Sequence, residues 1–170
     1  SSLFRPRIDR ILFAATKADH LHHSSHDRLE AVLRRAVAKA VAKAGDTGAG
    51  IDVVALAAVR ATREAQVQRG REKLPSILGT PACGEAANGE RFDGETEVAT
   101  FPGDLPDNPD ALFSGESAFR GLSSTAAEKS DFRFLRFRPP LLHGADVDGL
   151  ALPHIRLDRA LQFLIGDKLQ

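Results

Sequence analysis

Apolar residues form two short runs in the first third of the chain, the second interrupted by Asp52, with a longer amphipathic stretch between them. The runs cover residues 11–15 and 51–59. Runs of this length are typical of strands that are buried on both faces in a parallel sheet. Between them, apolar residues recur every three or four positions from about residue 25 to 44, which predicts one helix. Strand, helix and strand with short connections predict a βαβ unit, in which the two strands are parallel.

The hydrophobic pattern changes after Thr62. Residues 63–138 are rich in glycine, proline and charged residues and contain no long helical period, which predicts a β-rich insertion. Its expected features are a hairpin of 66–69 with 74–78, a turn at Asn88-Gly89, and strands at 97–101 and 132–138.

The final segment, residues 139–170, is expected to be a loop followed by a helix that packs back on the sheet. The helix is predicted to start near residue 152 and to end at Gly166, because apolar residues from Leu157 to Ile165 follow a helical period. The expected fold is therefore α/β: a parallel sheet with flanking helices in residues 1–62, the β-rich insertion in 63–138, and the closing helix.

Composition narrows the classes of function. The 170 residues include 23 basic and 23 acidic side chains, so the net charge is zero, which argues against a nucleic-acid surface. Cys83 is the single cysteine, so no internal disulfide forms, which suits a cytoplasmic protein. No apolar run approaches the roughly 20 residues of a membrane span. The chain lacks methionine and opens with Ser1, so we expect it to be part of a longer polypeptide.

The candidate chemistry begins where the first apolar run ends, at Thr16-Lys17-Ala18-Asp19. Open α/β sheets bind ligands at the carboxyl ends of their strands, and this sequence is a variant of the Asn/Thr-Lys-x-Asp element with which GTPases bind guanine. The Asp19 carboxylate can accept both the N1–H and the N2–H donors of guanine, which adenine does not offer together. The Lys17 stem would cover the base. Thr16 would hold the loop through its hydroxyl, without the amide of the commoner asparagine. The alternative is a strand that ends in a polar turn.

A second candidate lies at the end of the second apolar run, at Ala57, Ala58 and Val59. In GTPases the corresponding strand ends in small residues whose backbone N–H donates to guanine O6. The alternative is that these alanines fill a tight core. Strand order and spacing together favour nucleotide binding.

Two other clusters favour structural roles. His20, His22, His23 and His26 are metal-ligand types, but no cysteine or spaced second pair accompanies them, so we expect a solvent-facing cluster and no metal site. The alternating Phe and Arg residues of 132–138 resemble a nucleic-acid strip, but a charged edge strand is the favoured interpretation.

A phosphate-binding loop requires G-x-x-x-x-G-K-S/T. The nearest string runs from Gly79 to Gly84, but Glu85 and Ala86 follow it where Lys and Ser/Thr are required. A carboxylate there would repel phosphate, so we reject it.

Four segments of this sequence resemble the carboxyl-terminal part of the YcjX-like family of P-loop NTPases. They are F-A-A-T-K-A-D-H at 13–20, L-A-A-V-R-A-T at 56–62, F-R-P at 137–139, and above all L-P-H-I-R-L-D-R-A-L-Q-F-L-I-G-D-K-L at 152–169. The resemblance implies part of a GTPase-like α/β domain, guanine nucleotide (GTP or GDP) as ligand, a cytoplasmic bacterial location and a link to stress response.

The family's phosphate and Mg²⁺ machinery is expected upstream of residue 1, so no catalytic residue is assigned here. GTP hydrolysis is expected only in the complete protein. The alternative function is non-enzymatic: a regulatory or interaction module that binds a protein partner through the insertion.

Overall fold

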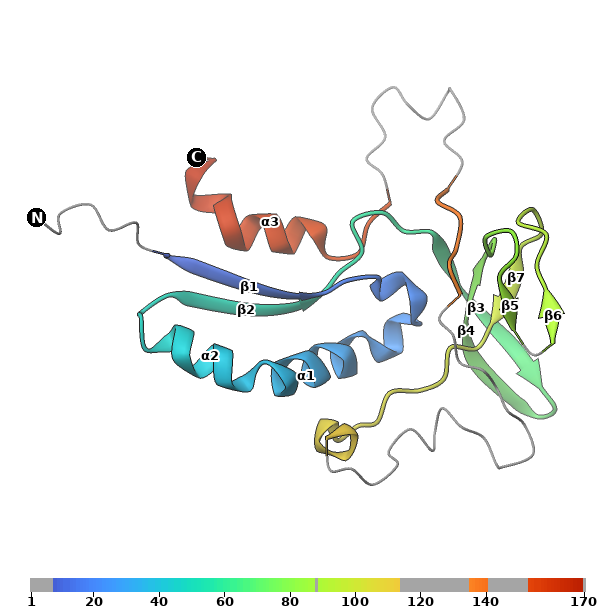
Figure 1. Cartoon of the computed structure of the whole chain (residues 1–170), viewed down its shortest axis with the longest axis horizontal. Coiled ribbons are helices and arrows are strands. Elements are labelled where there is room, and N and C mark those ends of the chain that lie inside the picture. The colour runs from blue at the N-terminus through green and yellow to red at the C-terminus, as the bar shows by residue number, and fades with distance from the viewer. Residues whose placement is uncertain (1–7, 88, 114–134, 141–152, 170) are drawn as a thin grey trace, which may run out of the picture.

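A computed structural model describes residues 8–87, 89–113, 135–140 and 153–169. Its centre is a parallel pair of strands, β1 (Arg10–Ala15) and β2 (Gly50–Ala55), in continuous register from Arg10–Gly50 to Ala15–Ala55. Helices α1 (His26–Ala36) and α2 (Ala38–Gly45) lie along one side of the pair, and α3 (Leu157–Ile165) lies along the other (Figure 1). The predicted α/β fold, with its parallel βαβ unit, is confirmed.

The core lies where the helices cover β2. Val53, Val54 and Ala55 are fully buried, and Ala44 of α2 and Ala160 of α3 are buried as well. Helices on both sides explain why most of this strand is apolar, and its charged residue, Asp52, pairs with Arg159 of α3.

Two boundaries differ from those expected. The predicted single helix is divided at Val37, whose backbone (φ −98°, ψ 12°) leaves the helical region, although the Val37 N–H still donates to Leu33 (2.9 Å). The second strand ends at Ala55 and not at residue 59, because Ala57 leaves β1 and pairs antiparallel with Ile155.

The β-rich region is a three-stranded antiparallel sheet in the order β3 (Thr62–Arg69), β4 (Glu72–Gly79), β7 (Val98–Thr100), beside a two-stranded ribbon of β5 (Ala86–Ala87) and β6 (Glu90–Arg91). The predicted hairpin and the short strand are confirmed, and the hairpin is longer than expected. Gly70 supplies the positive φ (64°) that its tight turn requires.

The strand expected over 132–138 falls partly outside the described residues, because the structure describes it only from residue 135. Phe137 forms an antiparallel bridge with Pro81, and the Arg138 N–H donates to Thr80 (2.8 Å). The Phe137 ring lies so close to Gly79 that a side-chain carbon there would meet it at 2.8 Å. The end of β4 is therefore packed directly under this segment.

Short 3₁₀ turns complete the described chain: η1 (Ala18–His20), η2 (His23–Ser25), η3 (Pro109–Leu112) and η5 (Gly166–Lys168). Helix α3 starts at Leu157, later than expected, because Ile155 is engaged in the bridge with Ala57. Across the described segments, every helix is too short or too polar to traverse a lipid bilayer.

Candidate functional site

The Thr16–Asp19 sequence forms a tight loop where β1 ends. Lys17 adopts a left-handed backbone (φ 60°, ψ 37°) at the N-cap position of η1. Thr16 and Lys17 are exposed, whereas Ala18 and Asp19 are buried. A left-handed lysine is uncommon and persists only where surrounding contacts hold it, which points to a loop of defined shape.

The ends of the two parallel strands are joined directly. The Leu56 N–H donates to Ala15 (2.9 Å), and the Ala18 N–H donates back to Leu56 (3.1 Å). The two segments singled out in the sequence are thereby adjacent at one edge of the sheet. Beyond this contact Ala57 is buried, while Ala58 and Val59 are exposed.

Asp19 ties the loop to the segment that follows β2. One oxygen of its carboxylate accepts the Ala61 N–H at 2.9 Å, and the Thr62 hydroxyl donates to its main-chain carbonyl. The residue is only 4% exposed. Each carboxylate oxygen has two lone pairs, so the bond to Ala61 leaves acceptor capacity for a ligand.

Two histidines, His20 and His26, make contacts that hold the Thr16–Asp19 loop in place. The His26 ring is buried and its Nε2 lies 2.9 Å from the Ala18 carbonyl, so this nitrogen carries the proton and donates. The His20 ring meets Phe137 edge-to-face at 5.4 Å. Burial, with a contribution from Lys17, lowers the pKa of His20 despite the opposing effect of Asp19. The prediction of a solvent-facing histidine cluster is wrong for His22 and His26, because both side chains are buried.

The segment before α3 lies against the turn that follows β2. Ala57 and Ile155 exchange backbone hydrogen bonds of 3.1 and 2.9 Å, and the Arg60 N–H donates to Pro153 (2.7 Å). We call residues 153–156 the carboxyl-terminal clasp. It fixes the backbone on both sides of Ala58 and Val59.

Arg156 anchors this clasp to α1. It has a left-handed backbone (φ 54°) and bonds to the carboxylates of Asp27 (2.9 Å) and Glu30. Burial acts to lower the pKa of Arg156, but the hydrogen bonds and charges of these carboxylates outweigh it and raise that pKa. Glu30 also accepts the Ala55 N–H (2.9 Å), so one carboxylate links α1, β2 and the clasp.

The Gly79–Gly84 string has none of the geometry of a phosphate-binding loop. Gly79 ends β4, and the chain continues through the Pro81 bridge and a turn into β5, where a phosphate loop would open a helix. Arg136 pairs with Glu85 (2.7 Å) and Arg138 donates to the Gly94 carbonyl (2.5 Å), so both arginines are engaged within the chain.

Comparison with known proteins settles the family. A family model described as "YcjX-like family, DUF463" matches residues 1–169. The chain belongs to the YcjX-like family. It is 36% identical over 168 residues to a protein named Ras-like GTPase YcjX from Escherichia coli strain K12, and 31% identical over 169 residues to one of the same name from Shewanella oneidensis strain MR-1. Each match covers 99% of this chain but 30% of the relative, so the chain spans about a third of the length of these relatives.

Sequence reasoning missed several structural residues of this YcjX-like chain. The acceptor role of Asp19 toward Ala61 and the clasp at Ile155 depend on backbone amides, which carry no side-chain signature. His26 was visible only as one member of a histidine cluster.

Proposed function

We propose that this chain is the base-recognition part of a GTPase, in which Thr16–Asp19 and Ala57–Val59 together bind guanine. The observation that supports this most is the hydrogen bond from Ala18 to Leu56 (3.1 Å), which holds the two segments at one edge of the sheet. Ligands of open α/β sheets bind at this edge. The relatives named Ras-like GTPase YcjX support the same function.

In this proposal each residue has a defined role. Asp19 accepts the N1–H and N2–H donors of guanine while keeping its bond to Ala61. Lys17 is exposed beside it, and its stem covers the base. The backbone N–H groups of Ala58 and Val59, in an exposed turn, donate to guanine O6. Thr16 stabilises the loop.

The test is Asp19→Asn in the full-length protein. An asparagine oxygen can still accept the Ala61 N–H, while its NH₂ group becomes a donor that matches xanthine and opposes guanine. We expect GTP affinity to fall by about tenfold or more, since one lost charge-assisted pair costs about 1.5–3 kcal/mol, and XTP affinity to rise.

The matched control is Asp52→Asn, which removes the carboxylate within β2 that pairs with Arg159 of α3. It should leave the affinities for both nucleotides unchanged. Unaltered GTP binding by the Asp19 variant, measured by titration calorimetry, would contradict base recognition by this loop.

Hydrolysis belongs to the complete protein in this proposal. The sequence contains no G-x-x-x-x-G-K-S/T segment, so the groups that hold the phosphates and Mg²⁺ come from other parts of the polypeptide. Steady phosphate release from purified residues 1–170, free of contaminating NTPases, would contradict this assignment.

A second function is a protein-interaction module in the β-rich region. It is favoured by the ribbon of β5 and β6, on which most side chains are exposed. Deleting residues 79–131 should then abolish binding of a protein partner and spare nucleotide binding. Loss of both together would contradict a separate module.

A further inference from the structure

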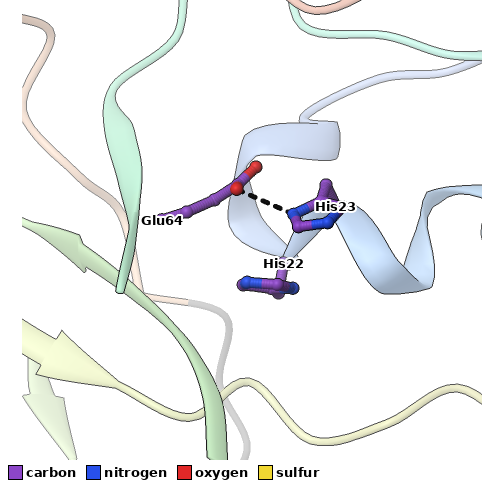
Figure 2. Close-up of side chains that lie close together, drawn as sticks. All are labelled: His22, His23 and Glu64. Carbon is purple, nitrogen blue, oxygen red and sulfur yellow. Dashed lines mark hydrogen bonds and ion pairs between the residues drawn. The ribbon is translucent and has the colours of Figure 1, made fainter. Parts of the chain in front are cut away.

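Three metal-ligating side chains converge beside the proposed nucleotide loop and take no part in it. His22 directly precedes η2, His23 begins η2, and Glu64 extends from the neighbouring strand β3 (Figure 2). Each offers one ligand atom, and these atoms lie within 4.8 Å of one another. Glu64 is 41 residues from His23 in the chain, so the hairpin of β3 and β4 is what brings it here.

His22 has the environment of a ligand imidazole. Its ring is nearly buried, and Nδ1 lies 2.9 Å from the Ser24 hydroxyl. Nδ1 also accepts the Ser24 N–H at 3.3 Å. A metal ion at Nε2 therefore requires the tautomer in which Nδ1–H donates to the Ser24 hydroxyl in place of that contact, the arrangement of most metal-bound histidines.

His23 and Glu64 face each other at 2.7 Å, from Nδ1 to Oε2. A tetrahedral zinc ion holds its ligand atoms about 3.4 Å apart. The two side chains would therefore have to move apart by less than about 1 Å for the ion to replace the proton that they share. The His23 side chain is 63% exposed and free to make that movement. The open side also leaves room for water to complete the coordination.

We propose that His22, His23 and Glu64 form a binding site for a divalent transition-metal ion, with Zn²⁺ as the first candidate. Two imidazoles and one carboxylate with an open position are a ligand set typical of zinc and unsuited to Mg²⁺, which prefers oxygen ligands. The site is therefore distinct from the Mg²⁺ that accompanies a bound nucleotide. The sequence predicted no metal site because the third ligand is remote in the chain.

Arg60 sets the expected strength of this site. Its guanidinium pairs with the other Glu64 oxygen, Oε1, at 3.2 Å and leaves Oε2 available. A positive charge this close opposes a cation, so we expect weaker binding than in a closed structural zinc site. Removing that charge in Arg60→Gln should raise zinc affinity several-fold, whereas a site that is merely an ion pair would show no such gain.

The experiment is competition between the full-length protein and a chromogenic chelator for added ZnCl₂, with Co²⁺ absorption as a second readout. His23→Ala and Glu64→Gln change exposed or half-exposed side chains and should preserve the fold, as circular dichroism will verify. Each should lower zinc affinity by about tenfold or more, and Ser24→Ala, which removes the partner of His22, by about tenfold.

Two matched controls separate this site from any other metal-binding group in the protein. His154→Ala removes a histidine that lies near Asp158. Glu97→Gln removes a carboxylate that pairs with Arg63, the neighbour of Glu64 on β3. Both should bind zinc as the unaltered protein does. Zinc affinities and Co²⁺ spectra that are equal in the unaltered protein, His23→Ala and Glu64→Gln would overturn the proposal.

Discussion

The Asp19 carboxylate holds the loop together, and in the proposed function it is also the group that accepts the base. Because it already accepts the Ala61 N–H, its orientation is fixed before any nucleotide arrives. Preorganisation of this kind lowers the entropy cost of binding. Substitution by alanine would therefore remove both the loop contact and the base contact, which is why the asparagine variant is the more informative one.

Asp93 shows how far backbone donors can stabilise a single exposed charge. The N–H groups of Thr96 and Glu95, followed by the Thr96 hydroxyl, lower the pKa of Asp93 from its ordinary value of 3.8 to about 2. For a carboxylate with a lowered pKa, the stabilisation is complete above 3.8 and is lost as the pH falls toward about 2.

We expect an NMR titration to give a pKa of about 2 for Asp93, and Thr96→Val to raise it because the hydroxyl donor is removed. Thr47→Val is the control, since that hydroxyl donates to Ala44 and not to Asp93. A Thr96→Val protein with an unchanged Asp93 pKa would show that the hydroxyl contributes nothing.

The carboxyl-terminal clasp makes the turn after β2 part of a wider framework of secondary structure. Its backbone bonds to Ala57 and Arg60 flank the residues proposed to contact O6, and Arg156 fastens it to α1. A loosened clasp would allow the turn to sample other conformations, and the affinity for a ligand falls with the fraction of molecules in the binding conformation.

We therefore predict that Arg156→Ala weakens GTP binding by the full-length protein several-fold and lowers stability by about 1 kcal/mol, the value of a partly exposed ion pair. Glu30→Gln should have a smaller effect, because its amide oxygen can still accept the Ala55 N–H. Arg35→Ala, which breaks the pair with Asp110, is the control and should not change GTP affinity. Calorimetry that finds equal GTP affinities for Arg156→Ala and Arg35→Ala would exclude a positioning role.

The elements that the sequence predicted best are those with a local pattern. The apolar run at 11–15, the helical period before Gly45 and the alternating hairpin each depend on neighbouring residues, and each appears in the structure. What could not be predicted depends on distant partners. Ala57 leaves the strand because Ile155 pairs with it, and Glu64 meets His23 through the sheet.

The candidate site likewise combines features with a local sequence pattern, which could be predicted, and contacts with distant residues, which could not. The nearness of Thr16–Asp19 to the end of β2 could be predicted, because parallel neighbouring strands end at one edge. The Ala61 amide and the supporting His26 ring could not, since neither makes a sequence motif.

The molecule as a whole leaves an apolar surface on its closing helix. Leu161, Leu164 and Ile165 of α3 are exposed, by 47, 37 and 40% respectively, although the helix packs its other side on β1. Within the described residues the parallel sheet has two strands, fewer than such sheets usually have. Exposed apolar patches of this kind favour association.

We expect residues 1–170, produced by themselves, to self-associate in a concentration-dependent way. Changing Leu161 and Ile165 to lysine should shift the population toward monomer, because the charges oppose burial of that face. Sedimentation velocity measures this directly. If the protein is a monomer at all concentrations, with or without the substitutions, the exposed surface of α3 does not mediate self-association.

The pairing of Ala57 with Ile155 also sets an order of events during biosynthesis. The strand and the loop that carry Asp19 leave the ribosome early, but the partner of the turn follows about 100 residues later, a delay of roughly 5–20 s at ordinary rates of translation. Until the clasp arrives, Ala57 and Arg60 lack the backbone partners that shape the turn. A nascent chain would thus complete the proposed nucleotide-binding turn late, well after most of the surrounding fold has been synthesised.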